Sequence, residues 1–321
     1  MKAENNLTEI DFLKKYDINK YFRPSVTVDA ILYTIGETYS SNYRKLAEKQ
    51  LEVLLIKRNT HPFKDVWAFP GKFIGENDTF VDAINNGIES DVHVNNIYLE
   101  QLYTWGDPNR DPRGRIISTS YMGLVSKETS KIVESDTLKW FCVKVNLLSE
   151  STKETKNGYK KTEDIEILLA AKDITLKNKV RVVKELKNGD LIIYTQILRS
   201  DLAFDHAKLL IYSIERLKNK VEYTTIAFNL LPEKFTLTEL QQVYEVLLDK
   251  PLLKANFRRK IADMVIETDF YDEFAGHRPS KLYCFNKNYQ SHMFWFQRNQ
   301  NQLNSNTIRY YSLFIIKPFT I

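Results

Sequence analysis

The chain has 321 residues, of which 43% are hydrophobic and 27% are charged, and its formal net charge at pH 7 is +5. This length suggests two domains of roughly 150 residues each, and the composition is that of a globular protein rather than a disordered or fibrous one. So small a net charge does not by itself indicate nucleic acid, and no apolar run approaches the roughly 20 residues that span a bilayer.

The first residues, MKAENNLTEIDFLKK, lack the apolar core of a secretory signal, so we expect a cytoplasmic protein with no membrane partner. Cys142 and Cys284 are the two cysteines, far apart and without CxxC spacing. This pattern argues against a disulfide framework or a zinc site, so we expect no structural metal.

The first half of the chain alternates between strand-like and helix-like segments. Runs rich in β-branched and aliphatic residues predict strands at 24–35, 51–59, 114–125 and 137–145. A helix is expected over 77–90, with Asp78 or Thr79 as its N-cap.

The next segment begins with SESTKETKNGYKKTED (149–164), which is polar and charged, and we expect a mobile surface loop or insertion there. Two apolar-rich runs then flank Asn188-Gly189, a favoured two-residue turn, and predict a β-hairpin over 179–198. A helix follows over 204–221, with one apolar stripe formed by Ala207, Leu210, Ile211, Ile214 and Leu217.

The composition then changes to two short helices and a hairpin. Thr236 and Glu239 have the spacing of a capping box at the start of a helix within 234–252. A second helix is expected over 254–268, with Phe257, Ile261, Met264 and Val265 on one face, followed by a turn and strand within 276–287. Helix, turn, helix and hairpin is the plan of a winged helix-turn-helix.

The stretch PGKFIGENDTFVDAINNGIESDVHV (70–94), together with LLIKRN and WAFPGKF, resembles the Nudix fold. A catalytic Nudix box places three glutamates on one helix face, where they hold magnesium or manganese against a diphosphate. In one register Lys72 takes the box glycine and Asp78 the first glutamate, while Asn86-Gly87 and Ser90-Asp91 take the two later pairs. A shift by one residue puts Asn86, Glu89 and Ser90 at the ligand positions. Either register keeps one carboxylate of three, so we expect no catalytic residue and no metal site here.

Residues 202–261 resemble the NrtR-type Nudix-related transcriptional regulators more specifically. The resemblance is carried by LAFDH, LLPEKFTLTELQ and NFRRK, and by RPSKLY further on. It implies an α+β chain, with a Nudix-like mixed α/β sandwich domain followed by a winged helix-turn-helix domain. We expect an effector-sensing domain at 1–221, with an insertion and hairpin at 149–200, and a DNA-binding domain at 222–287. The extension at 288–321 has no assigned role.

Candidate site residues fall in two groups. The arginines in DPNRDPRGR could bind phosphates bidentately, and a tryptophan could stack on a base or sugar. A lysine occupies the position of the box glycine. The effector-binding candidates are Trp105, Arg110, Arg113, Arg115 and Lys72. His206 is expected to orient a helix start rather than bind metal. The DNA-binding candidates lie on the second helix and in the wing: Lys254, Asn256, Arg258, Arg259, Lys260 and Arg278.

The sequence therefore indicates a ligand-responsive DNA-binding transcriptional regulator whose eroded Nudix domain senses a nucleotide-like effector, such as ADP-ribose, or a sugar. Its expected partners are operator DNA, the effector and a second copy of the chain. The alternative is a divergent Nudix hydrolase of ADP-ribose or another nucleoside diphosphate derivative, which would need Mg²⁺ and carboxylates from outside the box, such as Glu76 or Glu100. A winged helix that binds other proteins instead of DNA is a third possibility.

Overall fold

The computed structural model describes residues 8–38, 47–92, 97–130, 132–172, 174–272 and 279–289. Among these residues a ten-stranded sheet has the order β10-β9-β8-β7-β2-β1-β6-β5, with β3 paired to β2 and β4 to β1. Its strands are β1 (Ser25–Thr38), β2 (Glu48–Lys57), β3 (Trp67–Ala68), β4 (Gly71–Phe73), β5 (Tyr98–Trp105), β6 (Ile116–Leu124), β7 (Leu138–Thr155), β8 (Gly158–Ala171), β9 (Ile174–Lys187) and β10 (Asp190–Arg199).

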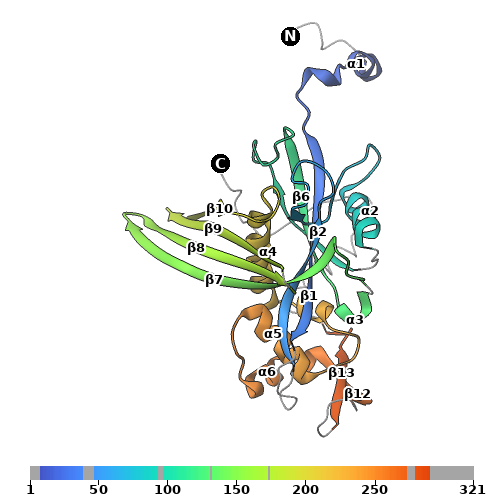
Figure 1. Ribbon diagram of the computed structural model, residues 1–321, viewed down its shortest axis with the longest axis vertical. Coiled ribbons are helices and arrows are strands. Elements are labelled where there is room, and N and C mark those ends of the chain that lie inside the picture. The colour runs from blue at the N-terminus through green and yellow to red at the C-terminus, as the bar shows by residue number, and fades with distance from the viewer. Residues whose placement is uncertain are drawn as a thin grey trace.

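The central strand β1 is buried on both faces. Val28, Ala30 and Leu32 point into one core, which α2 (Phe80–Val92) covers through Ile84 and Ile88. The alternate residues Ile31, Tyr33 and Ile35 point into a second, larger core that α4 (His206–Val221) covers. Figure 1 shows β1 and α4 side by side, with the curved strands β7 to β10 extending away from them.

The C-terminal helices and hairpin pack at one end of this sheet (Figure 1). They comprise η2 (Ile226–Leu230), β11 (Phe235–Thr236), α5 (Leu237–Leu248), α6 (Lys254–Ile261), η3 (Ala262–Met264), β12 (Val265–Asp272) and β13 (Ser280–Phe285). The short helices α1 (Glu9–Lys15), η1 (Ile18–Lys20) and α3 (Lys127–Ser130) complete the described elements.

The expected capping box is confirmed at the start of α5. Thr236 Oγ1 accepts a hydrogen bond from the Glu239 amide at 3.1 Å, and the Glu239 carboxylate accepts one from the Thr236 amide at 2.8 Å. Tyr244 of α5 meets Phe257 of α6 edge to face, with ring centroids 5.4 Å apart. These aromatic rings belong to the same continuous core as Tyr33, so the two parts of the chain share one interior.

Several local predictions are confirmed. The strands and α4 lie close to their expected ranges, and β9 and β10 form the expected hairpin, with Asn188 and Gly189 both at positive φ in its turn. Thr79 caps α2, since its Oγ1 accepts a hydrogen bond from the Asp82 amide at 3.1 Å. The boundary after residue 221 stays a prediction, although α4 ends there.

Two predictions were wrong. Residues 149–164 are not a loop but the outer part of the antiparallel pair β7 and β8, whose register continues to Thr155 and Gly158. Their charged side chains form ion pairs: Lys161 of β8 pairs across strands with Glu150 of β7 and, along its own strand, with Glu163, at 2.9 Å each. The second helix also ends at Ile261 rather than 268, because Val265–Asp272 pairs with β13 as a strand. The extension at 288–321, to which the sequence assigned no role, lies outside the described residues from position 290 onward.

Candidate functional site

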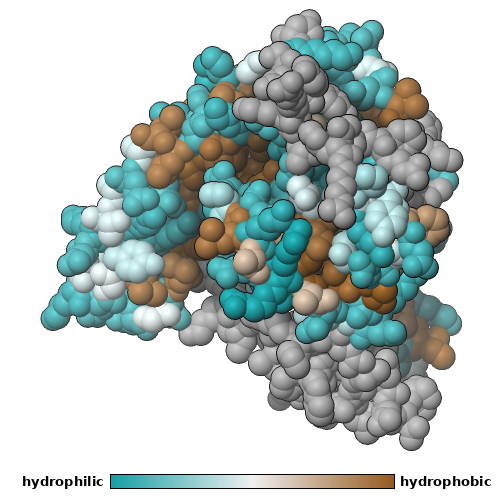
Figure 2. All heavy atoms as spheres, turned by 90° about the horizontal axis from the view of Figure 1, so that it is seen from below, coloured by the Kyte–Doolittle hydropathy of each residue, from teal (hydrophilic) through white to brown (hydrophobic). Residues whose placement is uncertain are grey.

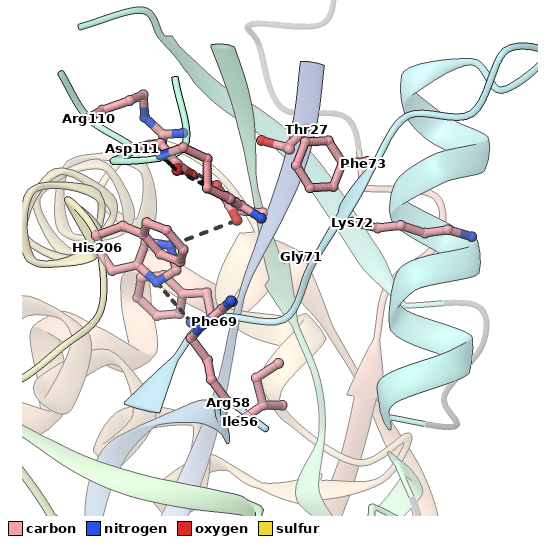
Figure 3. Close-up of a pocket in the computed structure, with 13 residues that line it drawn as sticks. Thr27, Ile56, Arg58, Phe69, Gly71, Lys72, Phe73, Arg110, Asp111 and His206 are labelled. Carbon is pink, nitrogen blue, oxygen red and sulfur yellow. Dashed lines mark hydrogen bonds and ion pairs between the residues drawn. The ribbon is translucent and has the colours of Figure 1, made fainter. Parts of the chain in front are cut away.

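A pocket of about 510 Å³, open mouth included, lies between β1, the β3–β4 segment and the start of α4. It is lined by three arginines, a lysine, two aspartates, a histidine and aromatic rings (Figure 3). The lining residues are Thr27, Asp29, Ile56, Arg58, Phe69, Gly71, Lys72, Phe73, Arg110, Asp111, Arg113, Phe204 and His206.

Two of the arginines lie over the ring of Phe204. The guanidinium carbon of Arg58 is 4.8 Å from the ring centroid and that of Arg113 is 5.5 Å from it. Burial and the nearby charge of Arg113 both lower the pKa of Arg58. The charge of Arg113 thus disfavours the charge of Arg58, and an anion bound beside both would stabilise it.

Arg113 is also held from the side. It donates to Asp111 at 2.7 and 3.0 Å and lies 5.0 Å from the centre of the Phe73 ring. Although burial alone would raise the pKa of Asp111, the hydrogen bonds from Arg113 lower it, so this carboxyl is ionised at neutral pH. The Arg113 side chain remains 38% exposed and can still reach a ligand.

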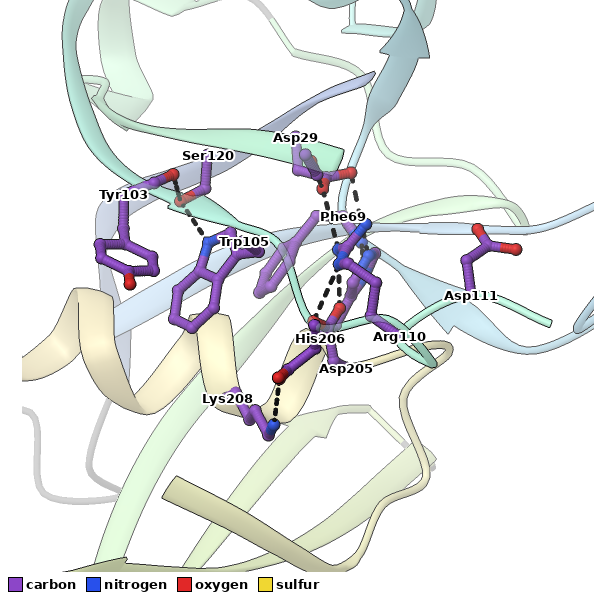
Figure 4. A network of polar contacts seen from close by, with 12 residues as sticks. Asp29, Phe69, Tyr103, Trp105, Arg110, Asp111, Ser120, Asp205, His206 and Lys208 are labelled. Atoms are coloured by element: carbon purple, nitrogen blue, oxygen red, sulfur yellow. Dashed lines mark hydrogen bonds and ion pairs between the residues drawn. The ribbon is translucent and has the colours of Figure 1, made fainter. Parts of the chain in front are cut away.

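Arg110 lies at the back of the pocket in a buried polar network (Figure 4). It donates two hydrogen bonds to Asp205, at 2.7 and 3.0 Å, and its guanidinium is 3.8 Å from Asp29. Asp29 also accepts a hydrogen bond from Ser118. The geometry of the Arg110–Asp205 contact is that of a bidentate pair, which fixes both side chains.

His206 is the first residue of α4 and joins the same network. Its Nδ1 accepts a hydrogen bond from the Phe69 amide at 3.0 Å, and its ring stacks on that of Phe69. Burial lowers the pKa of His206 to about 3, so the imidazole is neutral at physiological pH. Burial raises the pKa of Asp29, an effect that Arg110 opposes. As expected, His206 orients a helix start.

The structure brings together three of the five effector-binding candidates. Lys72, Arg110 and Arg113 all line the pocket. Trp105 lies outside it, and its indole N–H donates to Ser120 at 2.9 Å (Figure 4). The Trp105 ring packs edge to face against that of Tyr212.

Arg115 also lies outside the pocket and donates to the carbonyl of Gly106. The effector contacts proposed for these five side chains stay predictions.

The helix α2 occupies the place of the catalytic Nudix helix. The Lys72 side chain extends toward it from β4 (Figure 3), and the Lys72 Cβ lies next to the position that a Gly87 side chain would take. Among the described residues no group of three His, Cys, Asp or Glu side chains could hold a metal ion. Lys72 and Gly87, two positions of the expected Nudix box, are therefore neighbours in the structure.

The two carboxylates that could have served a hydrolase from outside the box lie elsewhere. Glu100 accepts hydrogen bonds from Tyr98, at 2.8 Å, and from Lys220, and its Oε1 is 3.6 Å from Arg216. Its charge is thus compensated within β5 and α4. Glu76 is exposed in the segment between β4 and α2.

The second helix of the winged helix, α6, presents a cationic exposed surface. Lys254, Asn256, Arg258, Arg259 and Lys260 are all exposed, while Phe257 and Ile261 are buried. Arg278 lies outside the described residues. Figure 2, seen from the end that carries the winged helix, shows hydrophilic residues over the middle of this face. Hydrophobic atoms gather in the hollow between it and the projecting strands.

The sequence analysis missed several pocket residues, namely Asp29, Arg58, Phe69, Phe73 and Phe204. The segments that hold Arg58 and Phe204, LLIKRN and LAFDH, were already part of the resemblances. Their shared position was not visible, because residues 58 and 204 meet only when α4 begins against β2 and β4. Among the described residues, no helix combines the length and apolar character that crossing a membrane requires.

Comparisons with known proteins agree with this geometry. A model of the NrtR DNA-binding winged helix domain matches residues 227–285. The ADPR responsive transcriptional repressor NtrR of Acinetobacter baylyi is 29% identical over 284 residues, which cover 88% of this chain and 90% of that protein.

Two solved structures are also similar. NrtR of Shewanella oneidensis, solved in complex with a 27mer DNA, is 30% identical, with a TM-score of 0.56, and covers 81% of this chain and 93% of its own. A MutT/nudix family protein from Enterococcus faecalis is 25% identical, with a TM-score of 0.60, and covers 88% of this chain and 95% of its own. These matches confirm the expected Nudix-like domain followed by a winged helix.

Proposed function

The chain belongs to the NrtR-type family of Nudix-related transcriptional regulators, and we propose that the pocket at the start of α4 binds ADP-ribose and controls repression by the winged helix. The name of the Acinetobacter relative supports both parts of this proposal, the effector and the direction of regulation. The protein is thus a ligand-responsive DNA-binding regulator, acting in the cytoplasm as a homodimer.

The observation that carries the proposal is the position of Arg58 and Arg113 over the Phe204 ring in one pocket. A diphosphate would add negative charge beside Arg58, whose guanidinium donates to the backbone carbonyls of Thr60 and Pro62, and beside Arg113, which is already paired with Asp111. The exposed ring of Phe73 at the same pocket offers a face on which an adenine can stack. Asp29 and Asp111 supply acceptors for ribose hydroxyls.

We propose binding without hydrolysis because α2 no longer carries the carboxylate cluster. A divalent cation needs several oxygen ligands to be held against a diphosphate. Here the Lys72 Cβ lies next to the position that a Gly87 side chain would take, and the lysine side chain extends toward the helix. Such a site keeps the electrostatic recognition of a diphosphate but has no metal to activate water.

The DNA contacts are proposed for the N-terminal part of α6, where Lys254, Asn256, Arg258 and Arg259 are exposed. A recognition helix reads the major groove through these positions. A single winged helix covers one half-site, which supports the proposal of a two-fold pair of chains on a roughly palindromic operator.

The test is calorimetric titration of ADP-ribose into wild type, Arg58→Ala, Arg113→Ala and Arg115→Ala proteins. A charge-assisted contact is worth about 1.5–3 kcal/mol, so the first two changes should weaken binding by roughly 10- to 150-fold. Arg115→Ala is the matched control, because its guanidinium bonds to the Gly106 carbonyl outside the pocket. Absence of ADP-ribose binding to the wild type, or equal losses in all three variants, would refute the proposal.

A further inference from the structure

The helix α4 connects the pocket to the recognition helix in a single rigid element. Its 16 residues span about 24 Å. Its first residue, His206, lines the pocket, and its C-cap residue, Glu222, lies beside α6. A helix of this length is stiff, so a displacement at one end reaches the other.

At the pocket end, three consecutive residues connect the start of α4 to the proposed ligand site. Phe204 lies under the two arginines that would bind the diphosphate. Asp205 is held by Arg110, and His206 by the Phe69 amide. A ligand that draws the arginines toward its phosphates therefore changes the contacts that fix the start of α4.

The middle of α4 is anchored to the sheet. The hydroxyl groups of Tyr33 on β1 and Ser213 on α4 are 2.6 Å apart and buried. Ser213 lies near the midpoint of the helix. An anchor there favours tilting of α4 over sliding, so its two ends would move together.

At the far end, two lysines of the winged helix meet Glu222. Lys260 of α6 donates to the Glu222 carbonyl at 3.2 Å, and Lys250 lies 3.4 Å from the Glu222 carboxylate. The Lys260 ammonium is also 5.9 Å from the ring of Tyr244 on α5. Carbonyls at a helix C-terminus carry partial negative charge and have no partner within the helix, which makes them good acceptors for an ammonium.

We propose that Lys260 is a positioning residue rather than a contact to DNA. It connects the recognition helix to the end of α4 and so transmits effector binding to DNA binding. This inference rests on the proposed function, since it requires an effector and an operator. Its support is the direction of the Lys260 side chain, toward Glu222 and Tyr244. Arg258 and Arg259 on the same turn have no contact with α4 among those described and remain available for DNA.

The experiment measures the affinity of a DNA duplex, selected by the wild-type protein from random-sequence DNA, with and without saturating ADP-ribose. The ratio of the two affinities is the coupling, which for regulators is typically about 5- to 150-fold. Lys260→Ala should reduce the ratio to within about twofold of unity while ADP-ribose still binds with wild-type affinity to the DNA-free protein. Lys260→Arg, which can still donate to the Glu222 carbonyl, should restore it.

Lys254→Ala is the matched control, because Lys254 is exposed at the first position of the same helix. It should weaken DNA binding and flatten its salt dependence but keep the ratio unchanged. If Lys260→Ala behaves like Lys254→Ala, then Lys260 is a phosphate contact and the inference is wrong. If ADP-ribose does not change the DNA affinity of the wild-type protein, the proposed function is overturned, and this inference with it.

Discussion

Replacing Arg110 with alanine should destabilise the whole fold, because this side chain compensates two buried carboxylates. Only 4% of the Arg110 side chain and 7% of the Asp205 side chain are exposed. Asp29, 3.8 Å away, is 12% exposed. Removing one partner of a buried ion pair usually costs about 3–5 kcal/mol, since the remaining charge stays buried without compensation. At about 2 °C per kcal/mol for a chain of this size, the melting temperature should fall by roughly 6–10 °C.

The assay is thermal and urea unfolding of the ligand-free protein, followed by circular dichroism. The double variant Arg110→Met with Asp205→Asn should recover part of the loss, because it removes both charges of the pair and leaves no unpaired ion between them. Arg115→Ala, a change at a half-buried arginine of the same segment that pairs with no carboxylate among the described residues, should stay within about 0.5 kcal/mol of the parent. Arg110→Ala proteins that behave like this control would show that the buried network does not hold the start of α4.

Three further outcomes are expected. Burial lowers the pKa of His206 to about 3, below its ordinary 6.5, so the unfolded chain takes up the proton first as pH falls. The free energy of unfolding should therefore decrease by about 2 kcal/mol from pH 6.5 to 5, at roughly 1.4 kcal/mol per pH unit. A His206→Asn protein with the same pH dependence would contradict this. Thr236→Ala should lower the free energy of unfolding by about 1 kcal/mol through loss of the α5 cap, whereas Thr236→Ser should not; equal melting temperatures for both would remove the capping argument. With Mg²⁺ or Mn²⁺, the protein should not hydrolyse ADP-ribose, and turnover on the order of 1 per second or faster in a phosphate-release assay would favour the hydrolase.

The sequence by itself determined the features whose partners are close along the chain. Thr236 and Glu239 are three residues apart, so their reciprocal hydrogen bonds could be predicted from spacing alone. The Asn188-Gly189 turn needs only two residues that accept positive φ. The residues at the box positions of α2 can likewise be read directly from the sequence, and the expectation that no metal cluster binds there rests on them.

Where a prediction was wrong, the residue pattern was compatible with two kinds of local structure. The charges of 149–164 suggested a solvated loop, but Lys161 and Glu163 share one face of β8. Lys161 pairs with Glu150 on β7, and Glu163 pairs with Lys184 on β9. The end of α6 was placed too late because Val265 fits an apolar helix face as well as a strand. Only pairing with β13 decides between the two.

The tertiary structure alone decided which side chains form the pocket and what each one does there. Arg110 and Asp205 are 95 positions apart, and nothing local to the DPNRDPRGR segment shows that Arg110 is buried whereas Arg113 and Arg115 are not. Likewise, the sequence shows Lys260 only as one of several cations on α6. The structure places its ammonium 3.2 Å from the carbonyl oxygen of Glu222 at the end of α4. Contacts of this kind depend on how β1, α2 and α4 pack, because burial and charge compensation are properties of the assembled core and not of any one segment.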